Sequence, residues 1–452
     1  MWQRLVLGLY SALAWLAIPL LRRKLRRRAV AEPGYAWAVA ERFGHYTQPP
    51  ATASAPMPAR PLVWLHAVSL GETRAAAVLL PQLRTQIPGM RLLLTHGTAT
   101  GRAEGERLLQ EGDLQAWLPW DTPAAVRRFL VQFQPAIGVL MDTEVWPNLV
   151  AISRRQQVPL VLANARLNEK SLRGAQRLAW LARPAYGALA AVWAQTQPDA
   201  QRLRALGAPV AGVLGNLKFD AQPDARQWAQ GRAWRAAGQR PVLLLASSRE
   251  TEEALWLEIF KKKQAETLMQ QAQAAIKNEN RMPPVQWLLV PRHPQRFDEV
   301  EALCLAAGLS VARRSQWGVQ PPQADVWLGD SLGEMALYYG LADAALLGGS
   351  FAPLGGQNLI EALACGCPVV LGPHSFNFAE AAEQAVQAGA AKRVADIAEG
   401  VTQALAWVRD GPGHQRAVQC CAGFVAQHQG AAQRTAEAIG RLWAQRGAQS
   451  GA

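Results

Sequence analysis

Cysteine is scarce in this sequence, with five residues in 452. They are too few, and lie too late in the chain, to form the disulfide framework of a small secreted protein, so the sequence favours a reducing compartment. Cys365 and Cys367 stand one residue apart, but the second pair of ligands that a structural zinc site requires is missing. We therefore interpret these two residues as buried thiols.

Two common nucleotide-binding motifs are absent as well. No GxGxxG follows the first predicted strand and no GxxxxGK[ST] occurs, which disfavours a dinucleotide-dependent dehydrogenase and a P-loop NTPase. Beyond residue 28 the basic residues are dispersed, and no motif combines them with aromatic residues as nucleic-acid recognition requires. We therefore expect no nucleic acid among the partners.

Acidic residues are in deficit, with 34 Asp and Glu against 47 Lys and Arg, which gives a formal net charge of +13. Such an excess indicates anionic partners. Its densest part is RRKLRRR at residues 22–28, directly after the uncharged segment 5–21. This order is the reverse of a secretory signal peptide, in which the positive residues come first.

We interpret residues 1–28 as a membrane anchor with a basic flank. The apolar segment is slightly shorter than the roughly 20 residues that cross a bilayer, so a helix lying in the membrane interface is an open alternative. The positive-inside rule predicts that the rest of the chain stays on the cytoplasmic side. The other alternative is a core helix with a solvated basic end.

After the anchor, apolar segments alternate with helical patterns, as in parallel sheets covered by helices. A proline-rich loop is expected at residues 47–61. The predicted strands are residues 62–66, 91–96, 137–141 and 159–164, and then 241–247, 287–293, 324–330, 343–350 and 367–373. The sequence thus predicts an α/β protein with two doubly wound Rossmann-like domains, 29–215 and 241–452, joined by a hinge at 216–240. Ligands of such sheets bind beyond the carboxyl ends of the strands, so we expect the site in a cleft that the domains face.

The segment LLGGSFAPLGGQN, residues 346–358, places two glycine pairs between a predicted strand and a predicted helix. Amide groups at a helix N-terminus attract phosphate, and glycine allows a ligand to approach the backbone closely. Glu361, one turn into the helix, is placed to accept hydrogen bonds from a ribose. This pattern indicates a nucleotide site, and glycines that only make turns are the alternative.

The first half carries acidic residues at the ends of predicted strands. Glu72 opens a predicted helix, and Asp142 and Glu144 follow the strand at 137–141. Two carboxylates can share proton removal and charge stabilisation. Lys218 and Arg292 would add positive charge near a phosphate leaving group. The alternatives are that Glu72 only complements the helix dipole and that the two cations lie on the surface.

Seven motifs in order resemble the 3-deoxy-D-manno-octulosonic acid (Kdo) transferases of Gram-negative lipopolysaccharide synthesis: HAVSLGE, DTEVWPN, GNLKFD, PRHPQR, GDSLGEM, GGSFAPLGGQN and GPHSFNF. The resemblance implies a glycosyltransferase of the GT-B fold that transfers Kdo from CMP-Kdo, with inversion, to the anionic lipid A precursor lipid IVA at the inner membrane. It also implies that the first domain binds the acceptor and the second binds the CMP-sugar. No cofactor or metal is expected, and no DxD aspartate pair is present. The oligomeric state and the number of Kdo residues transferred stay open.

The resemblance also implies roles for individual residues. Glu72 corresponds to the general base, and Glu144 and Lys218 correspond to residues that stabilise the transition state. The expected CMP contacts are Pro291, Arg292, Gly333, Glu334, Met335, Asn358, Leu359, Ile360 and Glu361.

Two positions depart from the family pattern. Arg249 and Gln357 stand where members of the family often have histidine, so their roles stay open, as does that of the polar stretch at 261–284. Two other functions are alternatives. One is another GT-B enzyme, a UDP-sugar transferase or epimerase, and the other is a non-catalytic protein that binds the membrane surface.

Overall fold

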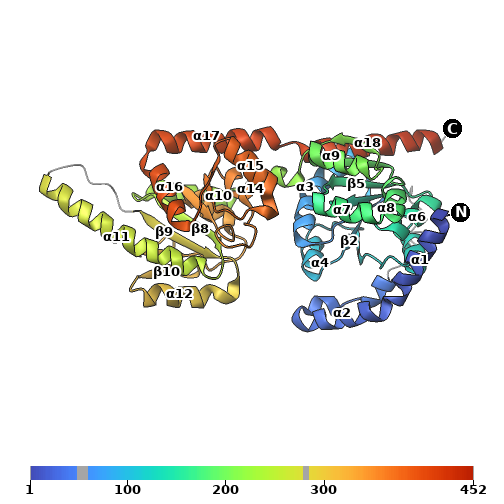
Figure 1. Cartoon of the computed structure of the whole chain (residues 1–452), viewed down its shortest axis with the longest axis horizontal. Helices are drawn as coiled ribbons and strands as arrows, with labels where there is room; N and C mark the ends of the chain where they lie inside the picture. The colour runs from blue at the N-terminus through green and yellow to red at the C-terminus, as the bar shows by residue number, and fades with distance from the viewer. Residues whose placement is uncertain (1, 48–59, 278–284, 451–452) are drawn as a thin grey trace. The chain divides into compact units, whose positions relative to one another are not determined.

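The chain divides into two units, each built on a seven-stranded parallel sheet. A computed structural model describes residues 2–47, 60–277 and 285–450. The first unit comprises Met1–Asp220 and His428–Ala452, and the second comprises Ala221–Gln427 (Figure 1). The predicted α/β class with two parallel sheets is confirmed. Residues 48–59 of the expected loop and residues 278–284 of the polar stretch lie outside the described residues.

The sheet of the first unit has the strand order β3-β2-β1-β4-β5-β6-β7, and all its strand pairs are parallel. Its strands are β1 (Leu62–His66), β2 (Arg91–His96), β3 (Leu114–Trp117), β4 (Ile137–Met141), β5 (Leu160–Ala165), β6 (Ala191–Ala194) and β7 (Val210–Val213). The direction of strand progression reverses between β1 and β4. In a doubly wound sheet this switch point is where ligands bind.

Both faces of this sheet are buried, as in other parallel sheets. Alternate residues of β1 point to opposite faces, so Val63 and Leu65 join one core cluster while Leu62 and Trp64 join the other. The covering helices are α3 (Leu70–Gln86), α4 (Ala99–Glu106), α5 (Pro123–Phe133), α6 (Pro147–Arg155), α7 (Glu169–Arg177), α8 (Ala179–Tyr186) and α9 (Gln197–Ala205).

The sheet of the second unit has the order β10-β11-β9-β8-β12-β13-β14 and reverses between β8 and β12. Its strands are β8 (Val242–Ser248), β9 (Gln286–Pro291), β10 (Val311–Arg313), β11 (Val326–Leu328), β12 (Ala344–Leu347), β13 (Val369–Leu371) and β14 (Ala391–Arg393). Its helices are α10 (Ala225–Ala237), α11 (Glu252–Lys277), α12 (Phe297–Ala306), α13 (Met335–Leu341), α14 (Leu359–Ala364), α15 (Ala379–Gln387), α16 (Ile397–Arg409) and most of α17 (Gly411–His428). The polar stretch after residue 261 continues α11 as far as Lys277.

Every predicted strand is present, but the sequence did not reveal β3, β6, β7, β10 and β14. These strands are three or four residues long, and several are alanine-rich or polar, as in the AKR of β14. They lie toward the edges of the two sheets. Short strands at an edge bury few side chains, so they leave a weak apolar signal in the sequence.

The boundary between the two units, Asp220/Ala221, falls within the hinge predicted at residues 216–240, but most of that segment belongs to one unit or the other. Leu217 is fully buried and Phe219 is 4% exposed, so the start of this segment is anchored in the first unit. The helix α10 belongs to the second unit, where it packs closely on α13. A Cβ atom at Gly231 of α10 would lie 2.2 Å from the carbonyl oxygen of Leu337, so only glycine permits this approach.

The second domain does not extend to residue 452 as expected. The last helix, α18 (Ala431–Ser450), lies in the first unit and packs against α3 (Figure 1). Ala436 and Ile439 of α18 are fully buried in the same cluster as Leu79 and Leu83 of α3. The Asp220 carboxylate accepts hydrogen bonds from the amides that begin α18, at 2.6 and 2.5 Å. This apolar seam and the cap explain why the chain returns to the first unit.

The apolar segment at 5–21 forms two helices where a single anchor helix was expected. They are α1 (Trp2–Leu16) and α2 (Ile18–Ala31), and Pro19 in the first turn of α2 has no N–H to continue the α1 hydrogen-bond ladder. Among the described residues, no single helix has both the length and the apolarity of a membrane crossing. The two helices meet that criterion only together, by length and composition, and the pair is bent by 46°.

One side of α1 contacts the rest of the first unit. The Tyr10 hydroxyl donates a hydrogen bond to Asp121 Oδ2 (2.9 Å), and Ser11 Oγ donates to Asn148 Oδ1 (2.9 Å). Asp121 also accepts hydrogen bonds from the first amides of α6, the helix that follows the DTEVWPN loop. These contacts connect α1 to the loop at the end of β4.

Candidate active site

The loops that follow β1 and β4 meet at the switch point of the first sheet. At the end of β1, Ser69 caps α3 by accepting a hydrogen bond from the Glu72 amide (3.4 Å). The Glu72 carboxylate accepts hydrogen bonds in return from Ser69 Oγ (3.1 Å) and the Val68 amide (2.8 Å). This reciprocal pattern resembles a capping box, so it both stabilises the start of α3 and fixes the position of the carboxylate.

The environment of Glu72 favours its protonated form more than water does. Burial, together with the negative charges of Asp142 and Glu144, raises the pKa of Glu72 to about 7, although the Val68 hydrogen bond opposes the shift. A carboxylate with a pKa near neutrality can take a proton from a hydroxyl and still be deprotonated in a large share of molecules. The proximity of three carboxylates thus suits Glu72 for the role of general base.

The two acidic residues after β4 have different surroundings. Asp142 is 3% exposed with a left-handed backbone (φ 56°), and its oxygens accept hydrogen bonds from Asn164 Nδ2 (2.7 Å) and Arg166 Nε (3.0 Å). The Glu144 carboxylate accepts one from Trp146 Nε1 (2.8 Å), and burial raises the pKa of Glu144. Asp142 therefore organises the loop, and Glu144 is the better placed of the two to meet a ligand.

Lys218 reaches this group through the short helix at Leu217–Asp220. The Asn164 side chain, which donates to Asp142, also accepts a hydrogen bond from the Leu217 amide (3.0 Å). Burial lowers the pKa of Lys218, while the charges of Asp142 and Glu72 raise it. The structure thus brings Glu72, Glu144 and Lys218 into one electrostatic group.

Sequence reasoning missed Asn164 and Arg166, which hold Asp142 in this group. Asn164 has a positive φ of 53° at the carboxyl end of β5. Asparagine is common in turns at strand ends, so no specific signal for this role was visible in the sequence.

The predicted CMP contacts lie at the carboxyl edge of the second sheet. They follow β9, β11 and β12, whose parallel directions bring their carboxyl ends to the same edge. Pro291 ends β9 and the exposed Arg292 follows it. Gly333 and Glu334 lie between β11 and α13, and Met335 begins α13. Asn358 caps α14, and residues 359–361 form its first turn.

Several of these residues already have partners within the protein. Glu334 Oε1 accepts a hydrogen bond from Arg314 Nη2 (2.9 Å), and the Gly333 carbonyl accepts one from Gln227 Nε2 (2.9 Å). Leu359 and Ile360 are each 1% exposed, so these two expected contacts offer almost no surface to a nucleotide in this structure.

The sequence predicted that the amides of the glycine loop after β12 are open to a phosphate, but three of them are already bonded to a carboxylate. The amide of Gly349 donates to both oxygens of Glu252 (2.9 and 2.8 Å), and the amides of Phe351 and Ala352 donate to Glu252 Oε1 (3.3 Å each). Glu252 is 1% exposed. Its carboxylate thus occupies these amides and holds the loop in shape.

The second glycine pair of this loop serves close packing. Gly355 and Gly356 are buried with φ of 89° and 73°, and a Cβ atom at Gly355 would lie 2.5 Å from Asn377 Nδ2. Next to the first pair, a Cβ atom at Gly349 would lie 3.3 Å from Gln357 Nε2 and 3.8 Å from Arg249 Cγ. The two residues that depart from the family pattern, Arg249 after β8 and Gln357 in the glycine loop, therefore both lie near Gly349.

The cysteines are free thiols, and the interpretation of Cys365 and Cys367 as buried is confirmed. Across residues 2–47, 60–277 and 285–450, no three His, Cys, Asp or Glu side chains are grouped so that they could hold a metal ion.

Comparison with known proteins agrees with the ordered motifs. Residues 38–221 match the family model described as 3-deoxy-D-manno-octulosonic-acid transferase (kdotransferase). The chain is 47% identical over 441 residues to a 3-deoxy-D-manno-octulosonic acid transferase of Bordetella pertussis, covering 96% of this chain and 98% of that protein. The chain belongs to the Kdo transferase family. A Haemophilus influenzae protein of the same description is 29% identical, covering 88% of this chain and 89% of its own.

This Kdo transferase family member is therefore an enzyme, a glycosyltransferase. Its fold is similar to that of a glycosyltransferase from Rickettsia africae, with a TM-score of 0.52, 10% identity and coverage of 85% and 98% of the two chains. It is also similar to a UDP-GlcNAc 2-epimerase from Neisseria meningitidis, with a TM-score of 0.54, 13% identity and coverage of 85% and 100%. At these identities the likeness concerns the fold alone.

Proposed function

We propose that the protein transfers Kdo from CMP-Kdo, with inversion and without a metal ion, to a hydroxyl group of the lipid A precursor lipid IVA. Membership of the Kdo transferase family supports this donor and this acceptor class. The observation that carries the proposal is Glu72, held by two hydrogen bonds at the switch point with a pKa of about 7.

In this mechanism the Glu72 carboxylate accepts the proton of the acceptor hydroxyl as its oxygen bonds to the anomeric carbon of Kdo. The bond between that carbon and the CMP phosphate oxygen breaks, and CMP leaves with the electron pair. Positive charge from Lys218 offsets the negative charge on the donor carboxylate or the departing phosphate. Such electrostatic stabilisation of the transition state is usually the largest single contribution to catalysis. The negative charge of Glu144 contributes to the electrostatic potential around Lys218 and the departing phosphate.

For the donor, we propose that CMP binds at the carboxyl edge of the second sheet. Three strand ends supply the expected contacts there, and the exposed Arg292 has a side chain that suits a phosphate. Transfer then requires the donor on the second unit to reach the carboxylates of the first.

For location, we propose attachment to the cytoplasmic face of the inner membrane, with α1 lying in the interface. Large apolar side chains are exposed along the helix pair at 58 to 68% of their surface: Leu5, Leu9, Leu13, Trp15, Leu16 and Leu20. The opposite side of α1 is held by Tyr10 and Ser11. A helix bonded to protein on one side and apolar on the other suits the plane of a membrane surface.

The test is incubation of the purified full-length protein with CMP-Kdo and a tetraacylated, bisphosphorylated lipid A precursor, followed by mass spectrometry of the lipid. The expected product is heavier by one or more Kdo residues, which also gives their number. A parallel incubation with UDP-sugars is the control for another nucleotide-sugar enzyme. Transfer from a UDP-sugar, or no transfer from CMP-Kdo, would contradict the proposal.

A further inference from the structure

A cavity of about 400 Å³ lies in the first unit beside Glu144 and Trp146. Its size is typical of a small-molecule site. One wall is formed by α1 and α2, and the other comes from loops at the carboxyl ends of the first four strands. We call it the α1–α2 cavity.

Two buried polar atoms on residues that line this cavity have no hydrogen-bond partner among the described residues: His66 Nε2 and Arg42 Nε. The two residues are 1% and 4% exposed. An unsatisfied buried polar group costs on the order of 1–3 kcal/mol. A ligand that fills the cavity and meets both atoms would remove this penalty.

The two atoms call for different ligand groups. His66 Nδ1 lies 3.1 Å from the Thr95 carbonyl oxygen and 2.9 Å from Thr95 Oγ1, and burial lowers the pKa of His66 to about 3. The ring is therefore neutral, and in either tautomer Nε2 can pair with a hydroxyl group, which both donates and accepts hydrogen bonds. Arg42 donates from Nη2 to the Gly97 carbonyl (3.0 Å), so its free Nε calls for an acceptor.

The charge around Arg42 calls for an anion. Burial, together with the nearby charges of Arg102 and Arg28, lowers the pKa of Arg42 to about 10, although Tyr35 and Glu41 oppose the shift. Lys24 and Arg28 of α2 line the same cavity, and Arg28 is positioned by a hydrogen bond to the Tyr35 hydroxyl (3.2 Å). Three cations that line one cavity suit the charge and hydrogen-bonding geometry of a phosphate group.

The remaining surface of the cavity is mainly apolar. Ala14, Ala17 and Leu21 contribute from the helix pair, and Leu118 contributes from the loop after β3. An apolar wall next to three cations fits an amphiphile with a phosphate and an acyl chain.

We propose that the α1–α2 cavity binds the phosphorylated, acylated sugar of the acceptor. Its phosphate lies on Lys24, Arg28 and Arg42, a sugar hydroxyl forms a hydrogen bond with His66 Nε2, and an acyl chain lies against Ala14 and Ala17. The N-terminal helices thus form part of the acceptor site in addition to attaching the protein to the membrane. This inference rests on the proposed function, because it takes the acceptor to be a phosphorylated glycolipid.

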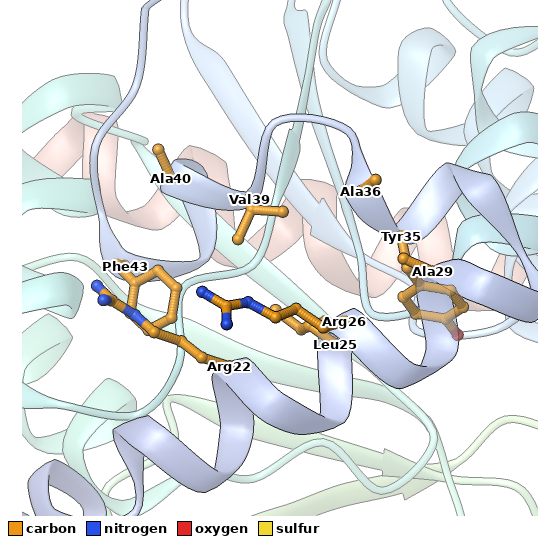
Figure 2. Close-up of a pocket in the computed structure, with 9 residues that line it drawn as sticks. All are labelled: Arg22, Leu25, Arg26, Ala29, Tyr35, Ala36, Val39, Ala40 and Phe43. Carbon is orange, nitrogen blue, oxygen red and sulfur yellow. The ribbon is translucent and has the colours of Figure 1, made fainter.

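A second cavity, of about 360 Å³, lies on another side of α2 (Figure 2). Leu25 and Tyr35 line both cavities, and Arg22 stands over the Phe43 ring at 4.7 Å. Among the described residues that line this second cavity, no buried polar atom lacks a partner. This difference favours the α1–α2 cavity as the ligand site.

The charge requirement is tested with two double variants of α2 in the full chain. The Lys24→Gln/Arg28→Gln variant removes two cations that line the cavity, and the matched Arg23→Gln/Arg27→Gln variant removes two exposed cations that do not. All four side chains are exposed, so folding is retained. Binding of the bisphosphorylated lipid A precursor in neutral detergent micelles is followed by tryptophan fluorescence, since Trp120 and Trp146 line the cavity. This binding assay needs no CMP-Kdo.

We expect the Lys24/Arg28 variant to bind the phosphorylated lipid roughly tenfold or more weakly, because it loses charge-assisted hydrogen bonds. The Arg23/Arg27 variant should stay within about twofold, and a dephosphorylated lipid should show no difference between the two. Equal loss in both variants would mean general attraction to the charged helix and would overturn the inference. Unchanged binding in both, or no binding by the wild type, would overturn it as well.

The apolar wall is tested with Ala14→Phe, which fills the cavity, against Ala12→Phe, an exposed position of the same helix that does not line it. Only Ala14→Phe should weaken lipid binding and raise the KM for the acceptor, and equal effects of the two would overturn the acyl-chain part. A wild-type protein that binds the lipid with this selectivity but transfers no sugar would uphold the cavity and refute the proposed function.

Discussion

Replacing Glu72 with glutamine removes the proposed base while keeping the size of the side chain. The glutamine carbonyl can still accept the Val68 amide, which is the shorter of the two hydrogen bonds at 2.8 Å. The start of α3 and the second unit should therefore be preserved. What the variant loses is the ability to take a proton from the acceptor hydroxyl.

The expected loss of activity is large. A positioned general base contributes about 10²–10⁴ in rate, so kcat of Glu72→Gln should fall by that factor. CMP binds the second unit in our proposal, so its stabilisation of the protein against heat should be unchanged. In the wild type, activity should rise with pH and level off above about 7, because the base must be deprotonated and burial raises its pKa to about 7.

Although Glu72→Gln removes activity, it should raise the stability of the fold at neutral pH. The pKa of Glu72 is 4.5 in the unfolded chain and about 7 in the folded protein. This shift corresponds to a free-energy cost of roughly 3 kcal/mol for ionising the carboxyl group in the fold. Because the folded pKa is the higher one, ionisation opposes folding. The penalty is absent below 4.5, grows between 4.5 and about 7, and stays constant above. Partial solvent access of the carboxylate reduces it to roughly 1–2 kcal/mol.

The assay measures Kdo transfer to lipid across pH and urea unfolding at about pH 4 and about pH 8. The Glu72→Gln protein should be inactive, and its stability relative to the wild type should be greater at the higher pH. Glu169→Gln is the matched control, because Glu169 also lies in the first turn of a helix but is exposed and outside the site. Activity of Glu72→Gln within tenfold of the wild type, or a wild-type profile that does not change near pH 7, would refute the reasoning.

Three further substitutions test the surroundings of the site. Lys218→Gln should lower kcat by about 10²–10³ with little change in CMP binding, and steady-state kinetics that show only a raised KM would contradict its role in the transition state. Asn164→Ala removes the link between Asp142 and the Leu217 amide, so the free energy of unfolding measured in urea should fall by about 2–4 kcal/mol. A fall of less than about 0.5 kcal/mol would mean that the link does not stabilise the site. Glu252→Ala leaves three loop amides without their acceptor. The variant should lose about 3–5 kcal/mol of folding stability and should also lose CMP binding. Unchanged CMP binding in calorimetry would show that the loop keeps its shape without Glu252.

The central strands and the start of the site could be predicted from the sequence because their signals are local. The LVWLH and IGVLM segments match β1 and β4 residue for residue, since a buried strand of a parallel sheet needs a continuous apolar run. Glu72 follows a strand and begins a helix in the sequence as in the structure. The seven ordered motifs then identified the family.

Other features depend on contacts between residues far apart in the chain. The sequence shows a glycine loop, but only the fold brings the Glu252 carboxylate to the Gly349 amide, about a hundred positions away. In the same way, α18 has a helical pattern that gives no sign of which unit its apolar side will meet.

The sequence by itself therefore determined the α/β class, the order of the main strands and the chemical type of the candidate residues, because each is set by neighbours within a few positions. The tertiary structure decided that Lys218 belongs to the first unit, that Asp142 organises the loop beside Glu144, and that two N-terminal helices enclose a cavity with Arg42 and His66. These features depend on which surfaces pack together. Packing creates burial, and burial in turn sets the pKa values and leaves some hydrogen bonds unmet.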